Sequence, residues 1–175
     1  MFGGPNSDKT GITSAPEDNL ESKMSTLVWK RSAPISSGEI RTTDPARIID
    51  IESRHQLVIE FLKKNNYDAL LVQNSSNFAW LTAGGDNAFG CPTEPITSLF
   101  ITHDARVVVT TNVESGRIFD IEIPGLGFQL KERPWHQPLE ILFQDLCRGR
   151  NVASDTGFGK TENISTDLSK MRRSL

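Results

Sequence analysis

Cysteine is scarce in this sequence, which contains only Cys91 and Cys147 among 175 residues. Two cysteines cannot build a disulfide framework, and their wide separation does not match the paired spacing of a zinc site. This composition is typical of a reducing compartment, where structural disulfides are rare. We therefore expect a cytoplasmic protein.

Long apolar runs and a strong excess of positive charge are also lacking. No segment is apolar enough to span a membrane, and Met1–Lys30 has no apolar core of the kind that a secretory signal needs. The formal net charge of −3 provides neither a basic stripe for nucleic acid nor a polybasic membrane patch. We expect no nucleic-acid partner and no membrane partner.

Hydrophobic residues make up 37% of the sequence, which is below the usual globular fraction, and the first forty residues account for the deficit. This part is rich in Gly, Ser, Thr, Asp, Glu and Pro and cannot bury enough apolar surface to fold alone. We predict a flexible leader over residues 1–41, in which Leu27–Trp29 could dock on the domain or on a partner. Met24 is an alternative start.

The stretch from Tyr67 to Gly84 organises the remaining chain. Ala69–Val72 is a short apolar run between polar residues, as expected for a strand that is buried on both faces. The next four residues, Asn74–Asn77, favour a turn or a helix cap because their side chains bond to the local backbone. An apolar segment containing Trp80 follows, and Gly84 or Gly85 can end it with a positive φ.

A helix is predicted to begin at Asp44-Pro45, an N-cap acceptor followed by a proline suited to the first turn. Its apolar stripe repeats at steps of three and four residues and comprises Ile48, Ile51, His55, Val58 and Leu62. His55 could be a ligand or a base. A packed, hydrogen-bonded histidine is favoured because no acidic residue or second histidine accompanies it.

The later elements complete an α/β pattern. A β-hairpin is expected from Thr97–Thr102 and Val107–Thr111, with a solvated His103 in its turn. Further elements are a strand over Phe128–Lys131, a helix with one apolar face, a strand over Val152–Ser154 and a final helix over Leu168–Leu175; the apolar face contains Leu139, Leu142, Phe143 and Leu146. The fold class that follows is α/β, a mixed β-sheet with helices on both faces.

The string Gly157–Thr161 ends like a phosphate-binding P-loop, because Gly159-Lys160-Thr161 follows a predicted strand. Ser154 stands where the first glycine of that motif belongs, and the residues after Thr161 are poor at starting the required helix. A flexible loop is the favoured interpretation. A stand-alone nucleotide-binding module that uses Gly157–Thr161 remains the alternative function.

No catalytic or metal-ligating constellation is visible in the sequence. The three histidines, His55, His103 and His136, are far apart and have no carboxylate cluster beside them. Glu114 could act in catalysis, but with Arg117 three residues later a structural ion pair is favoured. We therefore predict no catalytic residue and no metal ligand in this chain.

Several strings, in order, resemble the amino-terminal domain of the creatinase/prolidase/aminopeptidase P family, also known as the Xaa-Pro peptidase family. They cover the chain from about Arg47 to Leu175 and are Tyr67–Val72, Asn77–Thr82, the hairpin, Glu114 with Arg117, Pro134-Trp135, Val152–Asp155 and the closing Asp167–Leu175. One departure is Leu81-Thr82-Ala83-Gly84, which replaces the family's Leu-Thr-Gly. Another is Cys91, which stands where creatinase places an arginine, so the resemblance favours a peptidase-type parent over creatinase.

The resemblance implies a non-catalytic domain over residues 42–166, followed at 167–175 by the start of a linker helix to a separate catalytic domain. That other domain would hold a dinuclear metal such as Mn, so this chain itself would need no cofactor and would be inactive alone. The amino-terminal domain would mediate contacts in a homodimer or higher homo-oligomer and limit access of proline-containing peptides to the partner's active site. The candidate interface or access residues are Trp80, Phe89, Trp135 and His136.

Overall fold

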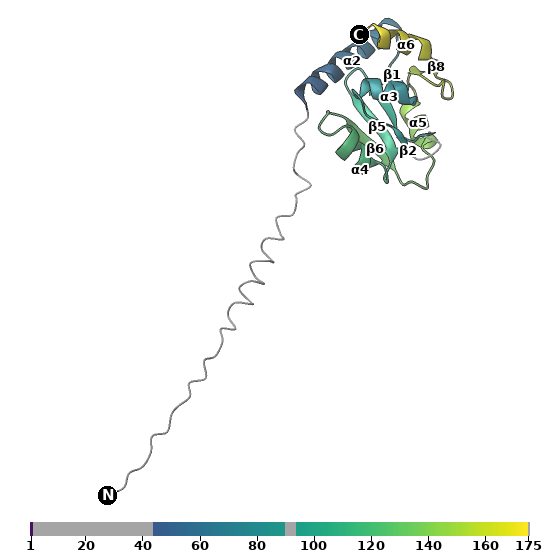
Figure 1. Cartoon of the computed structure of the whole chain (residues 1–175). Helices are drawn as coiled ribbons and strands as arrows, with labels where there is room; N and C mark the ends of the chain where they lie inside the picture. The colour runs from purple at the N-terminus through teal and green to yellow at the C-terminus, as the bar shows by residue number, and fades with distance from the viewer. Residues whose placement is uncertain (2–43, 90–93, 175) are drawn as a thin grey trace. The chain divides into compact units, whose positions relative to one another are not determined.

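The computed structural model describes residues 44–89 and 94–174, together with Met1 (Figure 1). The predicted flexible leader, the alternative start at Met24 and the comparison at Cys91 lie outside these residues. Within the described residues, the first helix along the chain is α2 (Pro45–Lys64). The Asp44 side chain accepts a hydrogen bond from the backbone of Ala46 at 2.9 Å, as the predicted N-cap requires.

A mixed sheet of six strands forms the centre of the domain, in the order β6-β5-β4-β1-β7-β8. Antiparallel pairing joins β1 to β4 and β4 to β5, whereas β5–β6, β1–β7 and β7–β8 are parallel. The strands are β1 (Ala69–Val72), β4 (Ser98–Thr102), β5 (Arg106–Thr111), β6 (Gln129–Arg133), β7 (Val152–Ser154) and β8 (Glu162–Asn163). A separate two-stranded sheet pairs β2 (Ala88–Phe89) with β3 (Glu94–Pro95).

Strand β1 is the predicted central strand, and all four of its residues are buried. Its side chains alternate between two hydrophobic clusters, with Leu70 and Val72 on one face of the sheet and Ala69 and Leu71 on the other. Because both faces are covered, the strand has no polar positions. This explains why its sequence is a continuous apolar run rather than an alternating one.

Helix α3 (Ser75–Leu81) follows β1 directly. Asn74 caps it by accepting a hydrogen bond from the backbone of Ser76 at 3.0 Å. The helix ends in left-handed backbone at Ala83 (φ 52°) and Gly84 (φ 106°). Glycine adopts this conformation without strain, which fits the predicted stop at Gly84, whereas Ala83 adopts it at some conformational cost.

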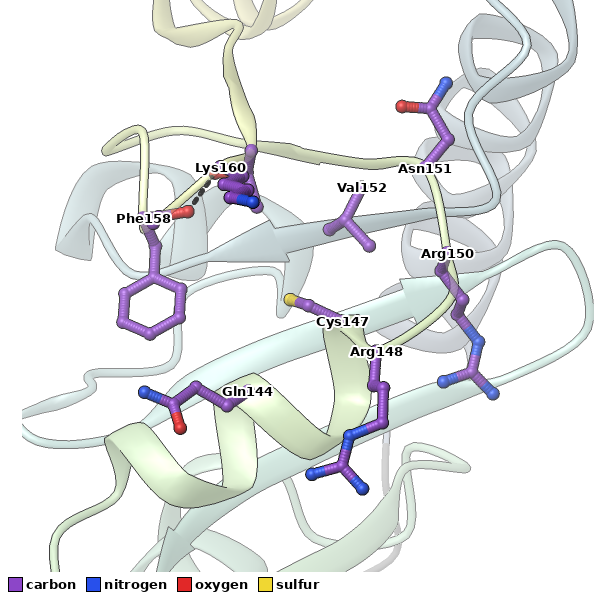
Figure 2. A pocket seen from close by; sticks show the side chains of 10 residues that line it. Gln144, Cys147, Arg148, Arg150, Asn151, Val152, Phe158 and Lys160 are labelled. Atoms are coloured by element: carbon purple, nitrogen blue, oxygen red, sulfur yellow. Dashed lines mark hydrogen bonds between the residues drawn. The ribbon is translucent and has the colours of Figure 1, made fainter.

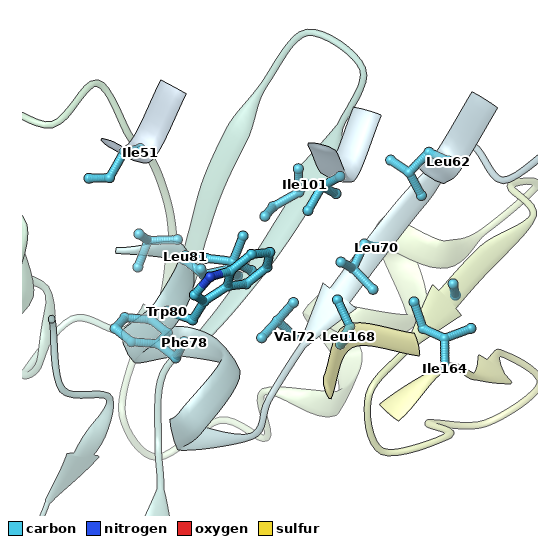
Figure 3. Packing of buried hydrophobic residues seen from close by; sticks show 14 of the residues in the cluster. Ile51, Leu62, Leu70, Val72, Phe78, Trp80, Leu81, Ile101, Ile164 and Leu168 are labelled. Carbon is cyan, nitrogen blue, oxygen red and sulfur yellow. The ribbon is translucent and has the colours of Figure 1, made fainter. Parts of the chain in front are cut away.

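The first face of the sheet is covered by α2, α3, the π-helical turn η1 (Ile118–Glu122) and α6 (Ser165–Arg173) (Figure 3). Six helical side chains that pack there are less than 2% exposed: Ile51, Val58, Leu62, Phe78, Ile118 and Leu168. The second face is covered by α5 (Glu140–Cys147), which buries Leu142, Phe143 and Leu146. The prediction of a mixed sheet with helices on both faces is therefore confirmed.

Several element boundaries differ from the sequence-based expectation. The final helix begins at Ser165 instead of Leu168, and Leu168 is fully buried in the core. Strand β6 runs two residues further than expected, to Arg133. Ile48, placed in the buried stripe of α2, is 39% exposed, because the first turn of the helix extends beyond the core.

Candidate functional site

The carboxyl ends of the parallel strands β1 and β7 meet at one edge of the sheet, where open α/β sheets commonly place ligand sites. Asp155 follows β7 and is only 4% exposed. Its carboxylate accepts hydrogen bonds from the backbone of Gln73 at 2.8 Å, the backbone of Asn74 at 3.0 Å and the side-chain amide of Asn77 at 2.9 Å. This carboxylate therefore fixes the turn between β1 and α3.

The polar edge continues across β4 and β5. Asn87 is fully buried and donates to the carbonyl oxygens of Thr97 at 2.8 Å and Gln73 at 3.2 Å. The hydroxyl groups of Thr97 and Thr110 lie 2.7 Å apart. A cleft of about 510 Å³ opens beside this edge and is lined by Gln73, Asn74, Ser75, Pro95 and Thr156. The described residues that line this cleft are neutral, and none of them carries a carboxylate, an imidazole or a thiol.

The sequence analysis did not identify Asp155, Asn77 and Asn87 as members of one network. A signal was present, because Asp155 and Asn74 each stand one or two residues beyond a buried strand. Parallel pairing of those strands brings such residues to the same edge. The pairing itself joins segments far apart in sequence and could not be deduced from either segment alone.

Glu114 and Arg117 form the ion pair that their spacing favours, with Arg117 Nε 2.8 Å from Glu114 Oε2. Arg117 also contacts Glu122 Oε1 at 3.0 Å and donates to the carbonyl oxygen of Asp86 at 3.3 Å. Glu122 in turn accepts from the backbone of Asp86 at 2.9 Å. These ion pairs and hydrogen bonds join the helical turn α4 (Ser115–Arg117) and η1 to the segment that leads into β2. The observed contacts of Glu114 and Arg117 therefore hold backbone segments together.

The candidate interface residues occupy different environments. Trp135 is 67% exposed in the connection between β6 and α5, and its indole contacts the neighbouring, exposed imidazole of His136 edge to face at 5.8 Å. Trp80 is only 9% exposed and packs in the core, with the Arg54 guanidinium 5.9 Å from its ring, so it has little area to offer a partner. The backbone of Phe89 lies in β2.

A metal site needs several His, Cys, Asp or Glu side chains close together. Within residues 44–89 and 94–174, no three His, Cys, Asp or Glu side chains are grouped so that they could hold a metal ion. His55 Nε2 lies 3.3 Å from the carbonyl oxygen of Thr102, and burial lowers the pKa of its imidazole. The described residues therefore do not fit a dinuclear metal centre.

The Gly157–Thr161 loop does not have P-loop geometry. A P-loop requires a helix directly after its Lys-Thr pair, so that the helix N-terminus faces the phosphates. Here β8 follows Thr161, and α6 begins only at Ser165. The backbone N–H and the hydroxyl of Thr161 both donate to the carbonyl oxygen of Phe158, at 3.0 Å and 2.6 Å.

Membrane insertion was considered for the helices of the described ranges. None of them combines the length and the apolar character that crossing a bilayer requires.

Comparison of the sequence with protein families finds no match, and comparison with curated proteins finds none either. Solved structures do match. The N-terminal domain of an Xaa-Pro dipeptidase from Lactobacillus brevis is 13% identical with a TM-score of 0.53, and the match covers 70% of this chain and 99% of that domain. The creatinase/prolidase N-terminal domain of an X-Pro dipeptidase from Streptococcus pyogenes is 14% identical with a TM-score of 0.50, covering 68% and 98%.

A longer structure matches over its corresponding part. The dipeptidase PepE from Mycobacterium ulcerans is 11% identical with a TM-score of 0.53, and the match covers 71% of this chain but only 36% of that protein. The similarity thus includes almost the whole of the isolated N-terminal domains and about a third of a complete dipeptidase. The described chain therefore has the fold of the creatinase/prolidase N-terminal domain.

Proposed function

We propose that this chain is the non-catalytic N-terminal domain of an Xaa-Pro dipeptidase or aminopeptidase-type metallohydrolase. In this proposal it mediates oligomer contacts and limits access to the partner's active site. The observation that supports it most strongly is the match to isolated N-terminal domains of Xaa-Pro dipeptidases over 98–99% of their length. The proposal extends to this chain a context that the neighbours' names give only for them.

An exposed apolar surface supports the assembly role. Val113 is 61% exposed and Trp135 is 67% exposed. Asn112 brings them together, because its backbone N–H donates to Arg133 O at 2.8 Å and its side-chain oxygen accepts from Trp135 N at 2.9 Å. Val113, Trp135 and His136 are called the Trp135 surface here. A tryptophan on a held backbone is a typical interface anchor, because little entropy is lost when it is covered.

The access role is supported by the contacts of Arg117. Its guanidinium and the Glu122 carboxylate both bind the backbone of Asp86, just before β2. Arg117 and Glu122 therefore hold Asp86, at the start of the segment that carries Phe89, and Glu114 holds Arg117 in place. A segment anchored in this way can contact a neighbouring subunit with little loss of entropy.

In this proposal, peptide hydrolysis takes place in another domain of the parent protein. A dinuclear metal such as Mn and the site for proline-containing peptides would lie in a separate catalytic domain. We further propose a homodimer or higher homo-oligomer in the cytoplasm, which agrees with the scarcity of cysteine in the sequence.

Light-scattering mass of the purified chain tests the assembly role. We expect a dimer or larger species for the wild type and dissociation of Trp135→Ala, because truncating a tryptophan anchor typically weakens a dimer by about 30-fold. Ile49→Ala is the matched control, since Ile49 is an equally exposed apolar residue (66%) on α2, outside the Trp135 surface. A wild type that stays monomeric at high concentration, or equal dissociation of both variants, would contradict the proposed surface.

A further inference from the structure

A second cavity lies on the face of the sheet that α5 covers, and the proposed assembly role does not use it (Figure 2). It measures about 540 Å³, within the range of about 300–1,000 Å³ that is common for small-molecule sites. Its walls come from the end of α5, the connection to β7 and the loop between β7 and β8. All of its lining residues lie between Gln144 and Thr161, so one continuous stretch of the chain forms the cavity.

The inner lining of this cavity is apolar. Val152 is 4% exposed, and the Phe158 ring is held against Phe143 in an edge-to-face contact at 5.4 Å. Cys147 contributes a half-buried thiol, and burial raises its pKa even though Arg150 acts in the opposite direction. The thiol is thus neutral near pH 7, and the lining suits a flat, uncharged group.

The rim has the opposite character. Arg148, Arg150 and Lys160 line the cavity, and none of its described lining residues is acidic. Arg148 is paired with Asp145 at 2.7 Å, whereas the Arg150 guanidinium donates to a neutral acceptor, the carbonyl oxygen of Leu146, at 2.6 Å, and has no ion pair within residues 44–89 and 94–174. No ion pair is found for Lys160 among the described residues. A chain with a net charge of −3 therefore contains a local concentration of positive charge at this cavity.

We propose that this cavity binds a phosphate monoester that carries a flat, largely apolar group, the class to which nucleoside monophosphates belong. The flat group packs against Val152, Cys147 and Phe158. Lys160, on the β7–β8 loop, binds the phosphate, and Arg150, on the α5 side, adds positive charge to the rim; Figure 2 shows the two side chains on separate walls, with the Arg150 guanidinium turned away from Lys160. Charge-assisted hydrogen bonds from guanidinium and ammonium groups are the usual means of phosphate recognition. Binding here depends on positively charged side chains at the rim of the cavity and not on a P-loop helix.

The test is calorimetric titration of the full chain with AMP, and with adenosine and inorganic phosphate as its two halves. We expect AMP to bind at least about tenfold more tightly than either half, because only AMP contacts both lining and rim. Lys160→Gln should weaken AMP binding by about tenfold, the change expected for losing one charge-assisted hydrogen bond, and Arg150→Gln should weaken it by a smaller factor, because it only removes positive charge from the rim. Lys160→Arg should retain binding, because it preserves the charge.

Lys63→Gln is the matched control, since it removes one positive charge from an exposed position on α2 and should leave AMP binding unchanged. Amide chemical shifts in the labelled chain locate the ligand, and we expect changes in Gln144–Val152 and Phe158–Thr161. The proposal is overturned if AMP does not bind, if Lys63→Gln weakens binding as much as Lys160→Gln, or if the shifts change elsewhere. Equal affinity for AMP and inorganic phosphate would also overturn it, because the apolar lining would then contribute nothing.

Discussion

Replacing Asp155 tests the polar network that holds β1, β7 and α3 together. Asp155→Ala removes the acceptor of three hydrogen bonds, from the backbone of Gln73 and Asn74 and from the side chain of Asn77. Asp155 is 4% exposed and Asn77 is 3% exposed, so water cannot readily replace the missing partner. The perturbation thus leaves buried donors unsatisfied.

The loss in the free energy of unfolding can be worked out from these three hydrogen bonds. Each buried donor left without a partner costs about 1–3 kcal/mol, and incomplete independence of neighbouring groups reduces the sum. We expect Asp155→Ala to lower the free energy of unfolding by about 3–5 kcal/mol. Asp155→Asn retains one acceptor oxygen but turns an amide NH₂ toward a donor, so a smaller loss of about 1–3 kcal/mol is expected.

Urea unfolding followed by far-UV circular dichroism measures both variants. Asp120→Ala is the control, because Asp120 is exposed in η1 and a surface substitution usually changes stability by less than about 0.5 kcal/mol. If Asp155→Ala unfolds within about 1 kcal/mol of the wild type, the network does not stabilise the sheet edge, and the reasoning is refuted.

Three further predictions concern the core and two titrating groups. Tyr67, the single tyrosine, has its pKa raised to about 12 by burial and by its hydrogen bond to Glu162. The folded state keeps the proton longer, so stability falls as pH rises from 10 toward 12; tyrosinate absorbance measures the pKa, and a value near 10 in the folded chain contradicts the prediction. Burial lowers the pKa of His55, so the unfolded state takes up the proton first and stability falls as pH drops below 6.5. Urea unfolding of His55→Gln should show a shallower decrease, whereas an unchanged slope would show that His55 does not contribute. Leu168→Ala should cost about 2–5 kcal/mol in the same assay, because Leu168 is fully buried; a loss under 1 kcal/mol would contradict its place in the core.

The local elements could be predicted where burial leaves a strong sequence pattern. The apolar run Ala69–Val72 became β1, and the strand over Val152–Ser154 became β7 at the predicted bounds. The hairpin and the capped start of α2 also follow from local signals, namely β-branched runs and the Asp44-Pro45 pair. In each case the residues that determine the element lie within it.

Features that depend on distant partners were missed or misplaced. Strand β8 consists of two exposed polar residues, Glu162 and Asn163, and forms because β7 offers a parallel edge. The start of α6 was placed too late, because residues 165–167 are all polar; the Asn163 side chain accepts a hydrogen bond from the backbone of Ser165 there. The network around Asp155 joins the residue after β7 to residues after β1, which lie far away in the sequence, so it has no local signature.

Hydrolysis of an Xaa-Pro dipeptide by this chain, with Mn²⁺ added, tests the central claim most directly. We predict no turnover above the rate of the metal alone, because the described residues provide no group of metal ligands and the proposal places the chemistry in another domain. Metal-dependent turnover that is lost on mutation of His55, His103 or His136 would show that the chain is itself a peptidase, in contradiction to its proposed role as a non-catalytic assembly domain.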